Sequence, residues 1–349
     1  MNRSIPQDIV VEILSWLPAK SLMRFKCVTK FFNSIIFDSD FTNIHKHRSL
    51  IRPDGTKFFL HGSDFYCTSQ NSASILQIES FDELPFHIHI DTLLNCVNDL
   101  FLLWQPLSAQ PATILNPSTR EVRYLPNLIE GFSWCHYSLG FEPEENKYKV
   151  LSTTIYDQNC CIKNMVFTLG IDESWRETEH IPPLILCKPG VCINGVIYRF
   201  VFHRGLAIVA FDVKTENSKL IALKDVSHGW SYELIEVKGK LAVVEYEIRS
   251  YEKIHLFVFE QTRKGEEWKS YAIQFPSTWK YIQQEIILDV KLSCTSCDGK
   301  ILFITNLKSG TLCLCYDVTR QSWRKLEIKG LRKNHFIIGI CSYVERLVM

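Results

Sequence analysis

One pair of cysteines has the spacing of a metal-binding motif. Cys294 and Cys297 form a Cys-x-x-Cys stretch, and thiolates at this spacing are common ligands of structural zinc. Such a site needs four ligands, and neither a second cysteine pair nor two histidines at ligand spacing follow. His87 and His89 lie in the alternating stretch FHIHI, which is typical of one face of a strand. We therefore predict no metal site and no cofactor.

The sequence also lacks the motifs that identify an enzyme. It contains no Gly-rich phosphate loop and no nucleophile elbow. Acidic residues, serines and histidines are plentiful, but their spacing does not pick out a catalytic triad. We expect a protein without catalytic activity of its own.

Composition excludes two further classes of partner. The 39 Lys and Arg residues are balanced by 38 Asp and Glu, so the chain has no overall basic charge to drive nucleic-acid binding. No apolar run approaches the roughly 18 residues that span a bilayer. The 13 cysteines are odd in number and scattered, as expected for reduced thiols. We expect a soluble protein of the cytoplasm, the nucleus or both, with no nucleic-acid or membrane partner.

The first 48 residues are predicted to be helical. Between Ile9 and Leu17 the apolar residues cover an arc of roughly 200°, about twice the width that a surface helix needs. Pro18 ends this helix, and a second apolar series continues to Ile36. Because so short a module cannot bury a full core alone, its surplus apolar surface must be covered. We predict that another protein covers it; the alternative is packing onto the rest of the chain.

From about residue 49 the pattern changes to short apolar strands separated by turns. The turns recur at spacings of roughly 44 to 60 residues, close to the period of propeller blades. They begin at Asp54, Asn98, Glu145, Asn194, Gly239 and Asp298. A second strand pair follows each of the last five turns, and three of these pairs carry a tryptophan followed by a basic residue, at Trp175, Trp268 and Trp323.

These patterns predict an α+β protein with two parts. Residues 1–48 form a small all-α module, and residues 49–349 form an all-β, propeller-like domain with six blades. The first repeat matches the others poorly. A two-sheet sandwich with fortuitous spacing is the alternative.

Both parts resemble one known family. Residues 5 to 48 resemble the F-box, and the matching positions are Ile5-Pro6, Asp8, Glu12-Ile13-Leu14, Leu17-Pro18, Ser21-Leu22, Arg24-Phe25, Cys27-Val28, Lys30, Phe41 and His45. The segments NPSTREVRYLP, YSLGFEPEENKYKVL and NGVIYRF resemble the F-box-associated, kelch-related domain of a large plant family. The chain departs from the family pattern at Ile5, Phe32 and the turn Asn98-Asp99.

The resemblance implies a role in protein ubiquitination. Helices of the F-box bind a Skp-type adaptor, which connects them to a cullin-RING ligase, while the β domain holds an unknown target protein. The chain would then be the substrate-recognition subunit of a Skp-cullin-F-box (SCF) ligase and would act by proximity. The residues expected to contact the adaptor are Ile5, Pro6, Ile9, Leu14, Leu17, Pro18, Leu22 and Val28.

Target binding is expected at loops on one end of the propeller. The candidate segments are 61–74, 105–112, 127–136, 156–164, 224–232 and 276–286. Aromatic side chains often dominate interfaces, and those in or beside these loops are Trp134, Tyr156, Trp230, Trp279 and Tyr281. Two other readings stay open: an adaptor-binding protein outside a ligase, and a propeller enzyme or sugar-binding lectin.

Overall fold

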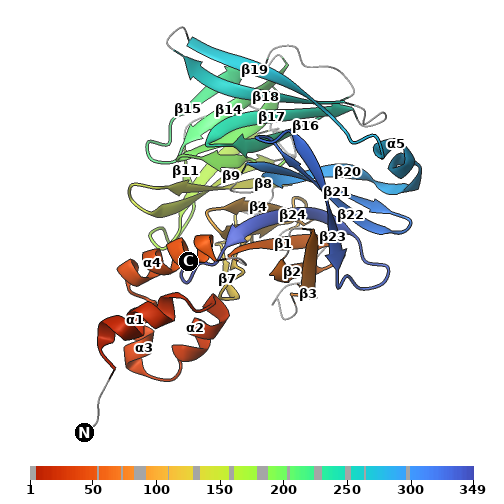
Figure 1. Ribbon diagram of the computed structural model, residues 1–349. Coiled ribbons are helices and arrows are strands. Elements are labelled where there is room, and N and C mark those ends of the chain that lie inside the picture. Colours follow the sequence, from red (N-terminus) through yellow and green to blue (C-terminus); the bar gives the residue numbers. More distant parts are fainter. Residues whose placement is uncertain are drawn as a thin grey trace.

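The computed structural model places helices and blades in the predicted order (Figure 1). It describes residues 5–52, 55–71, 74–81, 92–108, 110–128, 134–156, 161–178, 188–202, 205–223, 230–247, 253–262, 265–295 and 299–349. Within them, four helices precede a ring of six four-stranded blades. The prediction of a helical module followed by a six-bladed propeller is confirmed, and the two-sheet sandwich is wrong.

The helices form a compact N-terminal module. They are α1 (Gln7–Ser15), α2 (Ala19–Phe25), α3 (Lys30–Ile36) and α4 (Ser39–Ile51). Pro6 and Pro18 stand at the N-caps of α1 and α2, where a missing N–H costs nothing. The Asp38 carboxylate accepts hydrogen bonds from the first turn of α4, as expected for an acidic N-cap. Helix α4 continues three residues beyond the boundary at residue 48 that the sequence predicts.

Each blade contains four antiparallel strands. Blade I consists of β24 (Ile337–Val344), β1 (Thr56–Gly62), β2 (Phe65–Asn71) and β3 (Ile75–Ser80). Blade II consists of β4 (Leu93–Val97), β5 (Leu100–Trp104), β6 (Thr113–Asn116) and β7 (Glu121–Tyr124). Blade III consists of β8 (Trp134–Glu142), β9 (Lys147–Tyr156), β10 (Cys161–Thr168) and β11 (Arg176–Glu177). Blade IV consists of β12 (Val191–Ile193), β13 (Val196–Phe202), β14 (Leu206–Asp212) and β15 (Ser218–Ala222). Blade V consists of β16 (Trp230–Val237), β17 (Lys240–Glu247), β18 (Lys253–Thr262) and β19 (Gly265–Gln274). Blade VI consists of β20 (Ile286–Thr295), β21 (Lys300–Leu307), β22 (Gly310–Asp317) and β23 (Ser322–Lys329). Helix α5 (Trp279–Ile282) and a 3₁₀ turn (Gln283–Glu285) connect blades V and VI.

The two ends of the chain close the ring. Strand β24 pairs with β1 from Thr56 opposite Val344 to Gly62 opposite Ile337, so the last strand completes the first blade. This explains why the first repeat matches poorly, since its innermost strand comes from the other end of the sequence. Strand β23 also pairs in parallel with β3 and thereby joins blades VI and I.

Five of the six recurring turns are hairpins between the first two strands of blades II to VI. Both Asn98 and Asp99 have positive φ, as do Asn194 and Gly195, which is the geometry of a type I′ turn. Asp99 therefore occupies a left-handed position that glycine usually takes, and the hairpin forms despite this departure from the family pattern. The first turn of the series differs from the rest, because Gly55 connects helix α4 to β1.

The repeated tryptophans link neighbouring blades. The indole Nε1–H of Trp175 donates to the carbonyl of Pro126 at 2.7 Å. Trp268 donates to Ala222 at 3.2 Å, and Trp323 to Gln274 at 2.8 Å. Each acceptor lies 46 to 49 residues earlier, at the end of the preceding blade. An apolar cluster also fills each junction between neighbouring blades in the described residues.

Candidate functional site

The core of the helical module uses residues that the sequence analysis placed on its outside. Leu14 is 4% exposed and Leu22 is completely buried, and both pack against Ile36 and Phe41. The predicted contacts of Leu14 and Leu22 with a partner are therefore wrong. The cause is the width of the apolar arc, because periodicity does not separate an inward side from an outward one when most of a helix is apolar.

The remaining predicted contacts lie on or near the surface. Ile5, Pro6, Ile9, Pro18 and Val28 are exposed, whereas Leu17 is half-buried. Val28 is the most exposed large apolar side chain of the helical module, with 65% of its surface exposed. These side chains are available to a partner.

Further exposed apolar side chains extend this surface. Ile13 and Trp16 follow Ile9 at i+4 and i+7, so they continue one exposed stripe along α1. Phe25 and Phe31 are also exposed, and both rings contact Phe32 at centroid distances of 5.7 Å. The apolar surface of the helical module thus has an α1 stripe and an α2–α3 patch. We name these two regions together the exposed apolar surface.

Polar contacts hold α1 against α4 beside the stripe. The Arg48 guanidinium pairs with Glu12 at 2.5 Å and lies 4.9 Å from the centre of the Trp16 ring. The Trp16 indole donates to Glu12 at 3.1 Å. The hydrogen bonds from Arg48 and Trp16 lower the pKa of Glu12. The exposed Trp16 ring is therefore held in a defined position.

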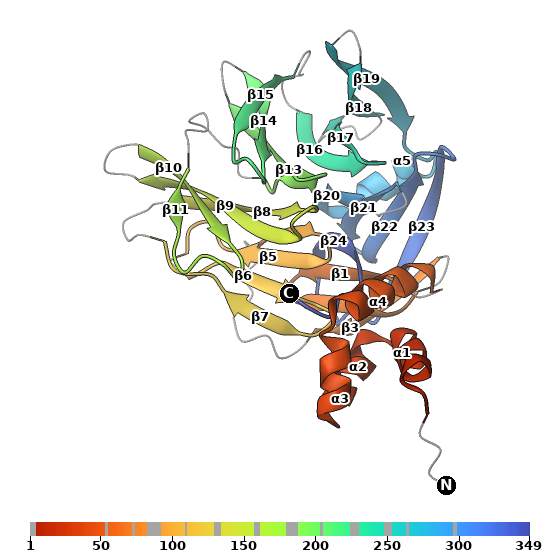
Figure 2. The same ribbon diagram turned by 90° about the vertical axis from the view of Figure 1, so that its left-hand side faces the viewer.

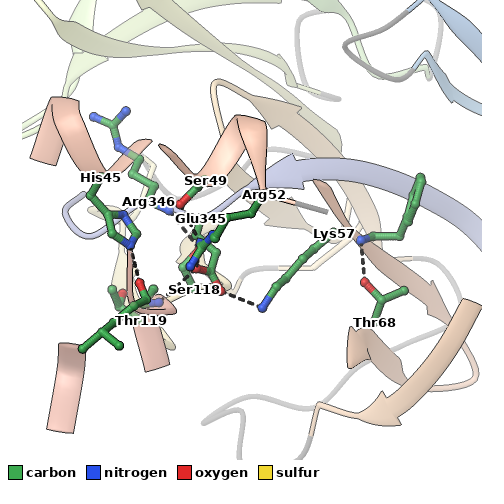
Figure 3. A network of polar contacts seen from close by, with 12 residues as sticks. His45, Ser49, Arg52, Lys57, Thr68, Ser118, Thr119, Glu345 and Arg346 are labelled. Atoms are coloured by element: carbon green, nitrogen blue, oxygen red, sulfur yellow. Dashed lines mark hydrogen bonds and ion pairs between the residues drawn. The ribbon is translucent and has the colours of Figure 1, made fainter. Parts of the chain in front are cut away.

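A buried carboxylate joins the helical module to the propeller (Figure 3). Glu345, just after β24, accepts hydrogen bonds from the Ala19 N–H at 3.0 Å and from Arg52 at 2.7 Å. It also pairs with Lys57 of β1 at 2.6 Å, and its side chain is 3% exposed. Burial alone would raise the pKa of Glu345, but the charge of Lys57 and the hydrogen bonds hold it below its ordinary value. One carboxylate thus binds α2, the end of α4 and blade I.

The C-terminal tail strengthens this joint. Leu347 is buried in the core of the helical module, next to Leu22. The Arg346 N–H donates to the Ser118 hydroxyl at 3.1 Å in blade II, and its guanidinium lies 5.2 Å from the centre of the Tyr148 ring in blade III. The last residues of the chain therefore contact both parts at once.

The turn Asn98-Asp99 supplies a second joint. Lys46 of α4 pairs with Asp99 at 2.8 Å, and the other Asp99 oxygen accepts the Val344 N–H at 2.8 Å. Lys46 also donates to the Asn98 side chain. The sequence predicts this turn as one of the recurring blade turns, but it does not predict the contact with α4, because an ion pair 53 residues apart leaves no local signal. The helices therefore sit on the end of the propeller that carries this turn, here called the helical end.

The candidate target-binding loops mostly lie at the opposite, far end. Trp134 begins β8 and Tyr156 ends β9, and these strand ends point away from the turns of the helical end. Figures 1 and 2 show α5 on the side of the propeller away from α1 to α4. Tyr281 on this helix is strongly exposed, and Trp134 is half-buried. The side chains of Tyr156 and Trp230 lie outside the described residues, as do parts of several loops.

Trp279 does not face a partner. Its ring is 3% exposed and stacks on Phe275 at a centroid distance of 4.5 Å, in the core between blades V and VI. The prediction that Trp279 anchors a target is corrected accordingly, since an aromatic residue in a loop sequence can still fill a core. Leu107 and Phe202 are exposed at the far end and were missed, because isolated apolar residues near turns carry no distinctive pattern.

The described residues hold no cluster of three or more side chains suited to a metal ion. Cys297 and the pair His87 and His89 lie outside the described residues. Among the helices that the structure describes, none has the length and apolarity to cross a membrane.

Comparison with known proteins agrees with this architecture. Residues 3–43 match the F-box domain, and residues 56–347 match the F-box associated beta propeller domain. The chain belongs to the F-box protein family. The further relation to kelch repeats stays a prediction.

Relatives of this F-box protein match it over most of its length. F-box protein At1g30790 of Arabidopsis thaliana is 32% identical over 315 residues, which cover 80% of this chain and 77% of that protein. F-box protein At2g21930 of the same plant is 29% identical over 351 residues, covering 94% and 87%. Among solved structures, the six-bladed lectin of Aleuria aurantia has a TM-score of 0.52 at 7% identity and covers 81% of this chain and 95% of that one. That likeness shows the fold alone.

Proposed function

We propose that this F-box protein is the substrate-recognition subunit of an SCF ubiquitin ligase. The helical module binds a Skp-type adaptor, and through it a cullin-RING ligase, while the propeller binds the target protein. The observation that carries this proposal is a family F-box whose core is filled within this chain, with Leu347 of the C-terminal tail, and which still leaves an exposed apolar surface. A soluble protein rarely leaves such a surface uncovered.

The size of this surface fits a stable interface. Its main contributors are Ile5, Ile9, Ile13, Trp16, Phe25, Val28 and Phe31. Each of these side chains is already partly buried, so covering its exposed remainder contributes less than the roughly 1.5–3 kcal/mol of full burial. Several such contributions can offset the roughly 4–15 kcal/mol that association costs in lost motion and ordering.

The joints at Glu345 and Asp99 support a tethering role. They fix the adaptor-binding helices on one end of the propeller and leave the far end for a target. A receptor that holds a target in a fixed place raises the effective concentration of its lysines near the ligase. The protein then needs no catalytic group of its own.

We further propose that the protein works in the cytoplasm, the nucleus or both. Eight cysteines in the described residues are free thiols, including Cys313 and Cys315, which are neighbours on one strand. Free thiols are the ordinary state in these reducing compartments. Localisation of a fluorescent fusion protein tests this proposal, and secretion of the fusion would contradict it.

Co-purification with a Skp-type adaptor and a cullin tests the ligase role. The double variant Ile9→Asp, Ile13→Asp places two charges on the α1 stripe and should abolish adaptor binding at an unchanged melting temperature, because both side chains are exposed. Ile171→Asp, on an exposed propeller loop, is the matched control and should still bind. A change at Leu14 is unsuitable, since its side chain is buried.

Two results would contradict the proposal. Adaptor binding that survives the double variant would show that the exposed apolar surface is not the interface. Adaptor that co-purifies without any cullin, and without ubiquitination of bound targets, would favour an interaction protein outside a ligase.

A further inference from the structure

A basic strip runs along the outermost strand of blade VI. Between residues 320 and 333 the sequence holds six basic residues and one acidic residue, Glu327, although the whole chain has 39 basic and 38 acidic residues. The side chains of all six basic residues are exposed. They are Arg320, Arg324, Lys325, Lys329, Arg332 and Lys333, here called the basic strip. Figure 1 shows β23, which carries the middle of the strip, at the rim of the propeller and apart from helices α1 to α3.

Acidic groups of the chain compensate this charge only in part. The three ion pairs of the strip are 3.3 to 3.9 Å long and their basic members are 48 to 83% exposed, so water screens them. In the described residues, no acidic side chain pairs with Lys325 or Lys333. The outer strand of blade V differs, because β19 mixes Glu266 and Glu267 with Lys269. The strip therefore keeps a net positive charge, which attracts an acidic partner.

The same strand has an open backbone edge. Strand β3 pairs with the outer side of β23 only from Glu327 to Lys329, and the Glu327 N–H donates to the Ser74 carbonyl at 2.8 Å. Because the backbone N–H groups of a strand alternate between its two sides, those of Lys325 and Trp323 point to the same outer side. Within the described part of the chain, neither meets a backbone acceptor there. The first half of β23 thus offers two free donors to an added strand.

The basic side chains flank this edge on both faces of the blade. Successive side chains of a strand point to opposite faces, so Arg324 lies on one face and Lys325 and Lys329 lie on the other. A chain added along the edge would itself alternate in this way. Positive charge therefore awaits its side chains on either face.

An acidic peptide fits these features better than a nucleic acid or a membrane. Single nucleic-acid strands are usually held by stacking on aromatic rings, but Trp323 stacks on Phe275 and its indole donates to Gln274. Glu327, in the middle of the strip, would repel a phosphate backbone. The strip also exposes no large apolar side chain that would enter a membrane. Peptide carbonyls, in contrast, accept the hydrogen bonds that the open edge offers.

We propose that the basic strip binds an extended, acidic segment of another protein, which adds as a strand along the first half of β23. Carboxylates of this segment pair with the exposed lysines and arginines, and its carbonyls accept from the free N–H groups. The strip is separate from the exposed apolar surface on the helical module. Under the proposed ligase role the occupant is a segment of the target; the binding itself does not depend on that role.

A labelled synthetic peptide of about ten residues, rich in glutamate with threonine and valine between, tests the proposal. Fluorescence anisotropy with the full chain should show saturable binding that weakens several-fold between about 50 and 300 mM NaCl. The same peptide with glutamine in place of every glutamate should bind at least about tenfold more weakly. Methylation of alternate backbone nitrogens keeps the charges but blocks strand pairing, so it should also weaken binding several-fold.

Variants assign the binding to the strip. Lys325→Glu with Lys329→Glu should weaken it about tenfold or more at an unchanged melting temperature, because both side chains are exposed. Arg123→Glu with Lys238→Glu is the matched control: it changes the net charge equally at exposed positions of blades II and V and should leave peptide binding nearly unchanged. Neither double variant should affect adaptor co-purification, which keeps this test separate from that of the ligase role.

Several results would overturn the proposal. Equal binding of the glutamate and glutamine peptides, or no binding at millimolar peptide, would show that the strip does not recognise acidic segments. Binding that survives the change at Lys325 and Lys329 would place the site elsewhere, and equal binding of the methylated peptide would exclude strand addition. Tighter binding of a single-stranded RNA oligonucleotide, or of vesicles with anionic lipid, would assign the strip to nucleic acid or membrane instead.

Discussion

Replacing Glu345 with glutamine should loosen the helical module from the propeller. The change keeps the shape of the side chain but removes the negative charge that Arg52 and Lys57 share. Removing one partner of a buried ion pair typically costs about 3–5 kcal/mol. Arg52 is 11% exposed and Lys57 is 24% exposed, so water recovers part of their solvation. We therefore expect a loss of about 2–4 kcal/mol in the free energy of unfolding.

Two measurements locate this loss. Urea unfolding gives its size, and hydrogen exchange gives its place, since exchange should accelerate in α2, where Ala19 donates to Glu345, and in the C-terminal tail. Glu144→Gln is the matched control, because its pair with Lys214 is exposed on both sides, so solvent screens it and its loss should leave stability nearly unchanged.

The dependence on pH gives an independent check. The pKa of Glu345 is lowered in the folded protein from an ordinary value of 4.5. Its contribution is therefore complete above pH 4.5 and is lost as the pH falls through the lower folded value. Glu345→Gln should remove this part of the acid-induced loss. A cost below about 0.5 kcal/mol, with unchanged exchange in α2, would refute the view that this carboxylate holds the joint.

Three further outcomes follow from contacts described above. Leu22→Ala should lower the free energy of unfolding by about 2–5 kcal/mol in urea titrations, because it leaves a cavity in the helical core, and a cost near zero would contradict that burial. Trp323→Phe should lower the free energy of unfolding by about 1 kcal/mol, because it removes the hydrogen bond from the indole to the Gln274 carbonyl. Unchanged stability would show that this bond does not help to hold the two blades together. The hydrogen bond from Arg176 holds the pKa of Glu216 at about 2, so Glu216 stabilises the fold above pH 4.5 and less as the pH falls towards 2. Glu216→Gln should therefore show a flatter stability profile in that range, and an unchanged profile would count against the ion pair.

Local patterns predicted most of the architecture. The spacing of turns such as Asn98-Asp99 and Asn194-Gly195 identified the blades, because each hairpin needs residues that tolerate positive φ. Closure by β24 was not predictable from local pattern, since it pairs residues at opposite ends of the chain. The family resemblance, rather than periodicity, pointed to the adaptor.

The site was harder to predict than the fold. Ile9 and Leu22 look alike in sequence, yet one is exposed and the other buried, because the choice depends on how four helices pack. The joints at Glu345 and Asp99 each depend on groups from distant strands or helices. A single charged residue in the sequence carries no sign that its charge will be buried.

Strand β24 also sets the order in which the protein can be completed during synthesis. Five blades can form as they leave the ribosome, but β1 lacks its inner neighbour until residues 337–344 emerge. Until then, a strand edge stays open to wrong pairing, and the helices lack Leu347 in their core. A nascent chain stalled before residues 337–347 have emerged would therefore expose both defects together, which offers chaperones and proteases a direct way to recognise unfinished copies.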